Sequence, residues 1–140
     1  MTIEDLGNIG EFVGAIGVIA SLVYLAVQIR RSDESTRAAT VQSLLGRSTE
    51  ITLQLVYSGF DPEKATELQR TQLLFGLFNH FNNAFYQKSV GMLDEETWMM
   101  FEVRIRGIID GTDEFEDWWQ QVNGSFSRSF VDHVNQMRHT

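Results

Sequence analysis

The chain has 140 residues, of which 43% are hydrophobic, 11% aromatic and 21% charged. This composition excludes a disordered tail and a multi-span membrane protein, and the length allows about one domain. Nineteen acidic residues against eleven basic ones give a formal charge of −8, which repels phosphate backbones and argues against nucleic-acid binding. The chain contains no cysteine, which excludes disulfides, thiolate metal sites and cysteine nucleophiles.

The first element along the chain is an uncharged apolar run over residues 12–29. As a helix this run reaches about 27 Å, and a start at Asn8 extends it to about 33 Å, which matches a hydrocarbon core of roughly 30 Å. Ten of its 18 residues are Phe, Val, Ile or Leu, which favour insertion. We therefore predict an N-terminal transmembrane anchor over residues 1–31, helical from about Asn8 to Ile29. The alternative is a buried helix of a soluble protein, which the apolar residues all round the helix disfavour.

The charges that flank this run predict its orientation. Acidic residues precede it, whereas Arg30 and Arg31 follow it, which is the reverse of a secretory signal peptide. Because Lys and Arg are retained on the cytoplasmic side, the short N-terminus is expected outside and residues 32–140 are expected in the cytoplasm.

Small residues recur along the predicted anchor at a spacing of four. They form the pairs Gly10-x-x-x-Gly14 and Gly17-x-x-x-Ser21. Such spacing stacks small side chains along one helix face, where another transmembrane helix can approach closely. We predict self-association or contact with another membrane protein at this face. The alternative is that these residues have no partner, since small residues are common in membrane helices.

The remaining residues predict an all-α fold, a small antiparallel helical bundle with short connections. No strong breaker separates Phe12 from Tyr57, so a continuation of the anchor helix past Arg31 is left open. The first stop is Ser58-Gly59, after which Asp61-Pro62-Glu63 predicts the start of a second helix. Its buried stripe is predicted from helical spacing and comprises Leu74, Leu77, Phe78, Phe81, Ala84 and Phe85.

Two or three further helices are predicted after Gly91. Asp94-Glu95-Glu96 opens the third helix, which Gly111 closes, with Trp98, Phe101, Ile105 and Ile108 on its inner face. Thr112-Asp113-Glu114 opens a fourth helix, and Gly124-Ser125 interrupts it. The last helical segment then carries three spaced apolar residues, Phe130, Val134 and Met137.

No motif in the chain predicts catalysis, a metal or a cofactor. The histidines, His80, His133 and His139, lack the spacing of a zinc pair, and no Glu-x-x-His is present. The acidic stretch from Asp110 to Asp117 lacks EF-hand spacing and is typical of a helix start. We expect His80 on a polar face or at a satisfied boundary position. A set of aromatic residues could line a ligand pocket but is more typical of a core: Phe81, Phe85, Trp98, Phe101, Trp118 and Trp119.

Several segments lie in order along nearly the whole chain: Gly10-Glu11 with Gly14-Ala15, Ser21 to Leu25, Gln28 to Arg30, Phe85 to Gln87, Gly91-x-Leu93-Asp94-Glu95-Glu96-x-Trp98, Trp118-Trp119 and Ser127-x-x-Phe130-x-Asp132. In this ordered set the chain resembles a widespread group of small uncharacterised bacterial membrane proteins. The resemblance implies a single-pass anchor in the bacterial inner membrane and a helical cytoplasmic domain, with no assigned activity. One departure is Arg128, where such proteins often have a proline.

Two functions follow as hypotheses. The first is a non-enzymatic interaction or structural protein in the lipid bilayer, either a homo-oligomer or an accessory subunit of a larger membrane complex. The second is a ligand-binding or sensory module whose aromatic residues hold an apolar molecule near the membrane surface. We favour the first, because the sequence carries glycine spacing and lacks chemical motifs.

Overall fold

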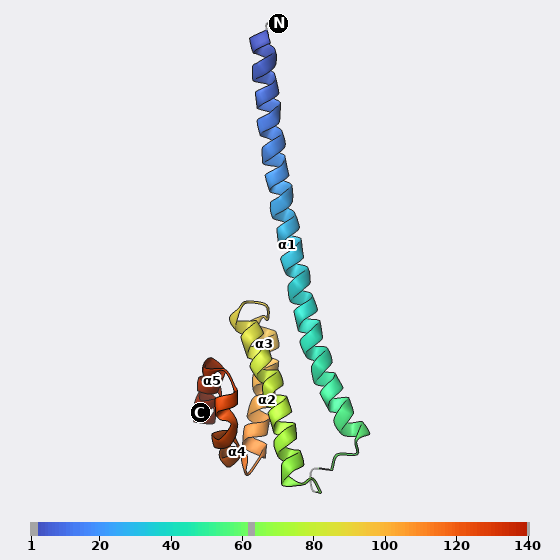
Figure 1. Ribbon diagram of the computed structural model, residues 1–140, viewed down its shortest axis with the longest axis vertical. Coiled ribbons are helices and arrows are strands. Elements are labelled where there is room, and N and C mark those ends of the chain that lie inside the picture. The colour runs from blue at the N-terminus through green and yellow to red at the C-terminus, as the bar shows by residue number, and fades with distance from the viewer. Residues whose placement is uncertain (1–2, 62–63, 140) are drawn as a thin grey trace. The chain divides into compact units, whose positions relative to one another are not determined.

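The computed structural model describes residues 3–61 and 64–139, with side chains from Gly10 onward. All regular structure in these ranges is helical, and they contain no strand. The elements are α1 (Ile3–Tyr57), α2 (Glu67–Ser89), α3 (Glu95–Gly111), α4 (Phe115–Val122), the short 3₁₀ turn η1 (Asn123–Ser125) and α5 (Arg128–Arg138), as Figure 1 shows. This confirms the predicted all-α fold with a long N-terminal helix and a small helical bundle.

The chain divides into two compact units, Met1–Ala38 and Ala39–Thr140. The described part of the first unit is entirely helical and belongs to α1. The second unit, which we call the bundle unit, holds the last turns of α1 and the helices α2 to α5. The division falls seven residues after the Arg31 end that the sequence predicts for the anchor.

Two helix boundaries show how local sequence sets the fold around residue 60. α1 ends at Tyr57, and Gly59 adopts a φ of 65°, so the predicted stop at Ser58-Gly59 is confirmed. The predicted start of the second helix at Asp61-Pro62 is wrong, because α2 begins at Glu67. Pro62 and Glu63 themselves lie outside the described residues.

A capping box explains the later start of α2. The Gln69 backbone N–H donates to Thr66 Oγ1 at 3.3 Å, and the Thr66 backbone N–H donates to Gln69 Oε1 at 2.9 Å. This reciprocal pair satisfies N–H groups that the first turn leaves without helical partners.

The later boundaries agree with the sequence. α2 ends two residues before Gly91, whose φ is 76°. Asp94 caps α3 by accepting a hydrogen bond from the Thr97 N–H at 2.7 Å, and this bond lowers the pKa of the Asp94 carboxyl. η1 lies at the predicted interruption around Gly124-Ser125.

The core of the bundle unit is largely aromatic. α2, α3 and α5 pack on one another. Phe78 of α2 is fully buried, with aromatic rings of α2, α4, α5 and the segment after η1 around it. Its ring lies 5.2 to 6.3 Å, between centroids, from the rings of Phe81, Phe115, Trp118, Trp119, Phe126 and Phe130. Burial confirms the predicted inner face of α5, at Phe130, Val134 and Met137. It also confirms the predicted inner face of α3 at Trp98, Phe101 and Ile105, whereas Ile108 is only partly buried against the core.

Candidate functional site

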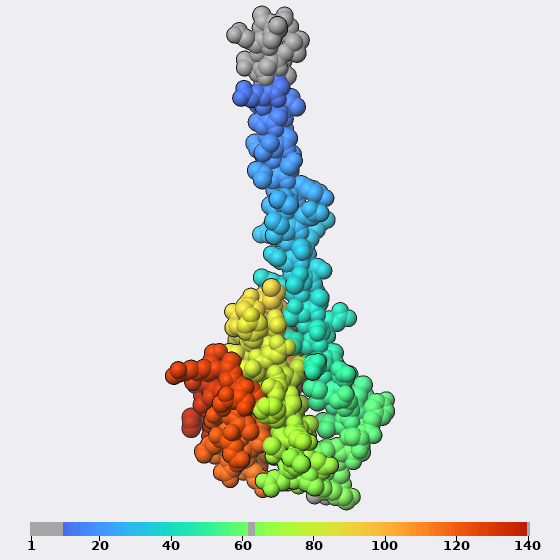
Figure 2. All heavy atoms as spheres, in the orientation of Figure 1, coloured from blue at the N-terminus to red at the C-terminus, as the bar shows by residue number. Residues whose placement is uncertain are grey.

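The unit Met1–Ala38 presents an apolar surface that no described residue covers. The large apolar side chains from Phe12 to Ile29 are between 46% and 68% exposed. In the space-filling view of Figure 2 this stretch is the blue part of the helix. The helix is long and apolar enough to cross a membrane, and none of its most apolar stretch is buried. This exposure counts against the alternative of a buried core helix, because water is a poor solvent for such a surface.

The small residues of this helix share one face. At 3.6 residues per turn, Gly10, Gly14, Gly17 and Ser21 fall within about 60° of the circumference. A Cβ added at any of the three glycines would meet nothing within 4 Å, and Ser21 Oγ donates to the Gly17 carbonyl at 2.8 Å. Gln28 lies five full turns from Gly10 and therefore has the same angular position. On this face the glycines leave the helix backbone accessible to a close neighbour. The Ser21 hydroxyl is hydrogen-bonded within the helix, and Gln28 adds a side-chain amide to the same face.

Arg30 and Arg31, which we expect to set the topology, follow the apolar run without interrupting α1. Both side chains are exposed, and neither forms an ion pair with any residue that the structure describes. They are therefore available to interact with solvent or lipid head groups.

The six aromatic residues singled out in the sequence lie in the bundle unit. Five of them are buried, and Phe85 is half-buried against them. Their rings pack on other rings, as in the pairs Phe85–Trp98 at 5.5 Å and Trp118–Trp119 at 6.1 Å. The indole N–H groups of Trp98 and Trp118 have no hydrogen-bond partner among the described residues.

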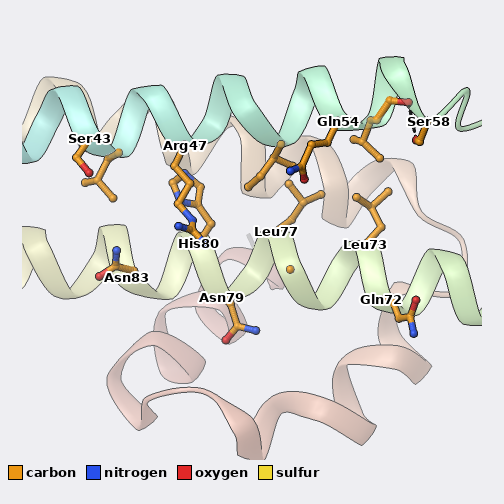
Figure 3. A pocket seen from close by; sticks show the side chains of 14 residues that line it. Ser43, Arg47, Gln54, Ser58, Gln72, Leu73, Leu77, Asn79, His80 and Asn83 are labelled. Atoms are coloured by element: carbon orange, nitrogen blue, oxygen red, sulfur yellow. Dashed lines mark hydrogen bonds between the residues drawn. The ribbon is translucent and has the colours of Figure 1, made fainter.

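An open groove of about 700 Å³ lies elsewhere in the bundle unit, between the last turns of α1 and helix α2. Figure 3 shows Arg47 reaching from α1 toward α2, while Leu73, Leu77 and His80 point from α2 toward α1. The groove is lined by Ser43, Leu44, Arg47, Ile51, Gln54 and Leu55 of α1, by Ser58 just beyond the end of α1, and by Gln72, Leu73, Gly76, Leu77, Asn79, His80 and Asn83 of α2. No aromatic ring other than the imidazole belongs to this lining, so the groove is not the pocket that the aromatic residues suggested.

His80 lines this groove, and the sequence left two positions open for it, a polar face or a satisfied boundary position. The residue is only 5% exposed, which excludes the polar face. Ser48 Oγ lies 2.8 Å from His80 Nε2 and 3.2 Å from the Leu44 carbonyl oxygen, and the imidazole tautomer decides which group donates in the contact with His80. Nδ1 is buried and has no partner among the described residues. His80 is therefore satisfied at one ring nitrogen only.

Two positively charged side chains act on His80. Burial lowers the pKa of His80, and the positive charges of Arg47 and Arg104 lower it further. Arg104 lies with His80 on the wall of a second groove of about 530 Å³, formed by α1, α2 and α3. Neither arginine forms an ion pair within the described residues. Neither groove has a carboxylate in its lining, although the chain carries nineteen acidic residues.

This arrangement predicts a pH dependence of folding. The unfolded chain takes up a proton on His80 near pH 6.5, whereas the folded chain does so only at lower pH. The free energy of unfolding should therefore be level above about pH 7.5 and fall as the pH decreases from about 6.5 toward 5. The pKa of Asp94 is lowered, so its protonation affects the free energy of unfolding only at still lower pH. Urea unfolding at a series of pH values measures this dependence.

His80→Gln should remove much of the decrease in the free energy of unfolding at low pH. His139→Gln is the matched control, because the imidazole of His139 is exposed. An unchanged pH profile in His80→Gln would contradict the assignment.

Comparisons with protein-family models, with curated proteins and with solved structures found no match to this chain. Among the described residues, no group of three or more His, Asp or Glu side chains could hold a metal ion. The physical chemistry of the two surfaces, the small-residue face of α1 and the groove at His80, is thus the basis for assigning a function.

Proposed function

We propose that this chain is a non-enzymatic, membrane-anchored interaction protein. It assembles as a homo-oligomer or serves as an accessory subunit of a larger membrane complex. The observation that carries this proposal is the face formed by Gly10, Gly14, Gly17 and Ser21 on a helix whose apolar surface is uncovered. In a bilayer such a face lets two helix backbones approach closely, which gains van der Waals contacts that lipid tails cannot match.

The position of Gln28 supports the same face as the contact. An amide within an apolar membrane segment is costly when it lacks a partner, and an interhelical hydrogen bond removes part of this cost. Because Gln28 and Gly10 have the same angular position around the helix, an approaching helix contacts the amide and the small residues together. The Ser21 hydroxyl needs no such partner, since it already donates to the Gly17 carbonyl.

The proposal includes a location and an orientation. The resemblance to small bacterial membrane proteins suggests the bacterial inner membrane with a single pass. The basic pair Arg30 and Arg31 favours a cytoplasmic bundle unit and an external N-terminus, since cytoplasmic flanks carry the excess of basic residues.

The test of this proposal is a pair of leucine substitutions in the full-length protein. Gly17→Leu places a bulky side chain on the small-residue face, and we expect it to weaken association by at least about tenfold, roughly 1.4 kcal/mol. Ala15→Leu makes a similar change on the opposite side of the helix and should leave association unchanged. Extraction in mild detergent followed by mass measurement reports both the oligomeric state and any co-purifying partner.

Two outcomes would count against the proposal. One is a wild-type protein that is a lone monomer with no co-purifying partner at every detergent concentration that keeps it folded. The other is equal weakening by Gly17→Leu and Ala15→Leu, which would show that association does not use the small-residue face.

A further inference from the structure

The groove between the last turns of α1 and α2 has the chemical character of a site for an amphipathic anion. One part of its wall is aliphatic, from Ile51 and Leu55 of α1 and Leu73 and Leu77 of α2. Beside this part lie Arg47 and His80, which reach toward each other from the two helices (Figure 3). An aliphatic wall next to a cation is complementary to a molecule with an apolar chain and an anionic head.

The polar residues of the groove favour a negative head group. Arg47 has no acidic partner among the described residues, and no carboxylate lines the groove in a chain of net charge −8. The Arg47 side chain is exposed, and a guanidinium that no carboxylate neutralises can form charge-assisted hydrogen bonds with the head group of a ligand.

We propose that this groove binds a medium-chain aliphatic carboxylate, with its head at Arg47 and its chain along Ile51, Leu73 and Leu77. A carboxylate carries one negative charge, which one guanidinium neutralises through charge-assisted hydrogen bonds. Helix geometry places Leu55 about 12 Å along α1 from Arg47, which suits a chain of medium length.

Gly76 makes the proposal testable without damage to the fold. It lines the groove in the middle of α2, where an added Cβ would meet nothing within 4 Å. Its backbone is helical, so Gly76→Leu fills the groove while it improves helix propensity. Gly46→Leu is the matched control, because Gly46 is an exposed helical glycine of α1 outside this groove.

The experiment measures binding of decanoate to the full-length protein in amphipol by calorimetry, with empty amphipol subtracted. We expect saturable binding to the wild type and to Gly46→Leu, and no saturable binding to Gly76→Leu. Arg47→Gln should weaken binding at least tenfold, because a hydrogen bond to a charged group is lost. Decanol, which has the same chain and no carboxylate, should bind at least tenfold more weakly than decanoate.

Several results would overturn the proposal. They are the absence of saturable decanoate binding to the wild type, binding that survives Gly76→Leu, and equal affinities for decanol and decanoate. A decrease in decanoate affinity in Gly46→Leu as large as that in Gly76→Leu would also overturn the proposal, because the groove would then not be the binding site.

Discussion

Phe78→Ala is expected to lower the free energy of unfolding of the bundle unit by about 4 kcal/mol, which is the range for a fully buried phenylalanine. The side chain is completely buried, and aromatic rings from α2, α4, α5 and the segment after η1 surround it. The alanine would leave a cavity that these rigid rings fill poorly. For a unit of this size the loss corresponds to a fall in Tm on the order of 20 °C.

Phe75→Ala provides the matched control for this prediction. It makes the same chemical change on the same helix, but Phe75 is 36% exposed. Phe75→Ala should lower the free energy of unfolding by less than half as much as Phe78→Ala, because the native protein buries less of the Phe75 side chain. Circular dichroism during urea and thermal unfolding of the full-length protein measures both variants. Equal losses would show that Phe78 is not the centre of the core.

The helices of the bundle could be predicted because their signals are local. For α3, Asp94 supplies the cap, and the spacing of Trp98, Phe101 and Ile105 gives the buried face. Each signal lies within one or two helical turns, so it can be read without knowledge of the neighbouring helices.

Two local signals compete for the start of α2. Asp61-Pro62-Glu63 has the form of a cap followed by a first-turn proline, which is a strong preference. Thr66-x-x-Gln69 has the form of a capping box, which is also visible in the sequence and is the signal that the structure follows. The choice between them follows the packing of the helix, because its buried face begins only at Leu74.

The groove at His80 could not be predicted for a different reason. His80 lies off the apolar stripe of α2, so periodicity alone leaves it either on a polar face or at a boundary position. Its burial depends on Ser48 of α1 and on the ring of Phe101 of α3, which lie far from it in sequence. Such tertiary contacts have no signature in the spacing of residues along one helix.

Ile19→Arg is expected to move most of the protein out of the membrane fraction. Ile19 lies near the middle of the apolar run, too far from either end for an arginine side chain to reach the interface easily. The substitution changes the insertion free energy by about 3 to 4 kcal/mol, which is comparable with the few kcal/mol that the whole run gains. Partitioning between carbonate-washed membranes and the soluble fraction measures the effect.

Gln42→Arg is the control for the added charge, because Gln42 is an exposed residue of the same helix beyond the apolar run. It should leave the protein in the membrane, since its position places the arginine outside the hydrocarbon core. If Ile19→Arg also stays in carbonate-washed membranes, the apolar run does not carry the insertion free energy, and the anchor hypothesis fails. If the Ile19→Arg protein leaves the membrane fraction while the Gln42→Arg protein stays, contact with lipid explains the exposed apolar surface of α1. In water such a surface would be unfavourable.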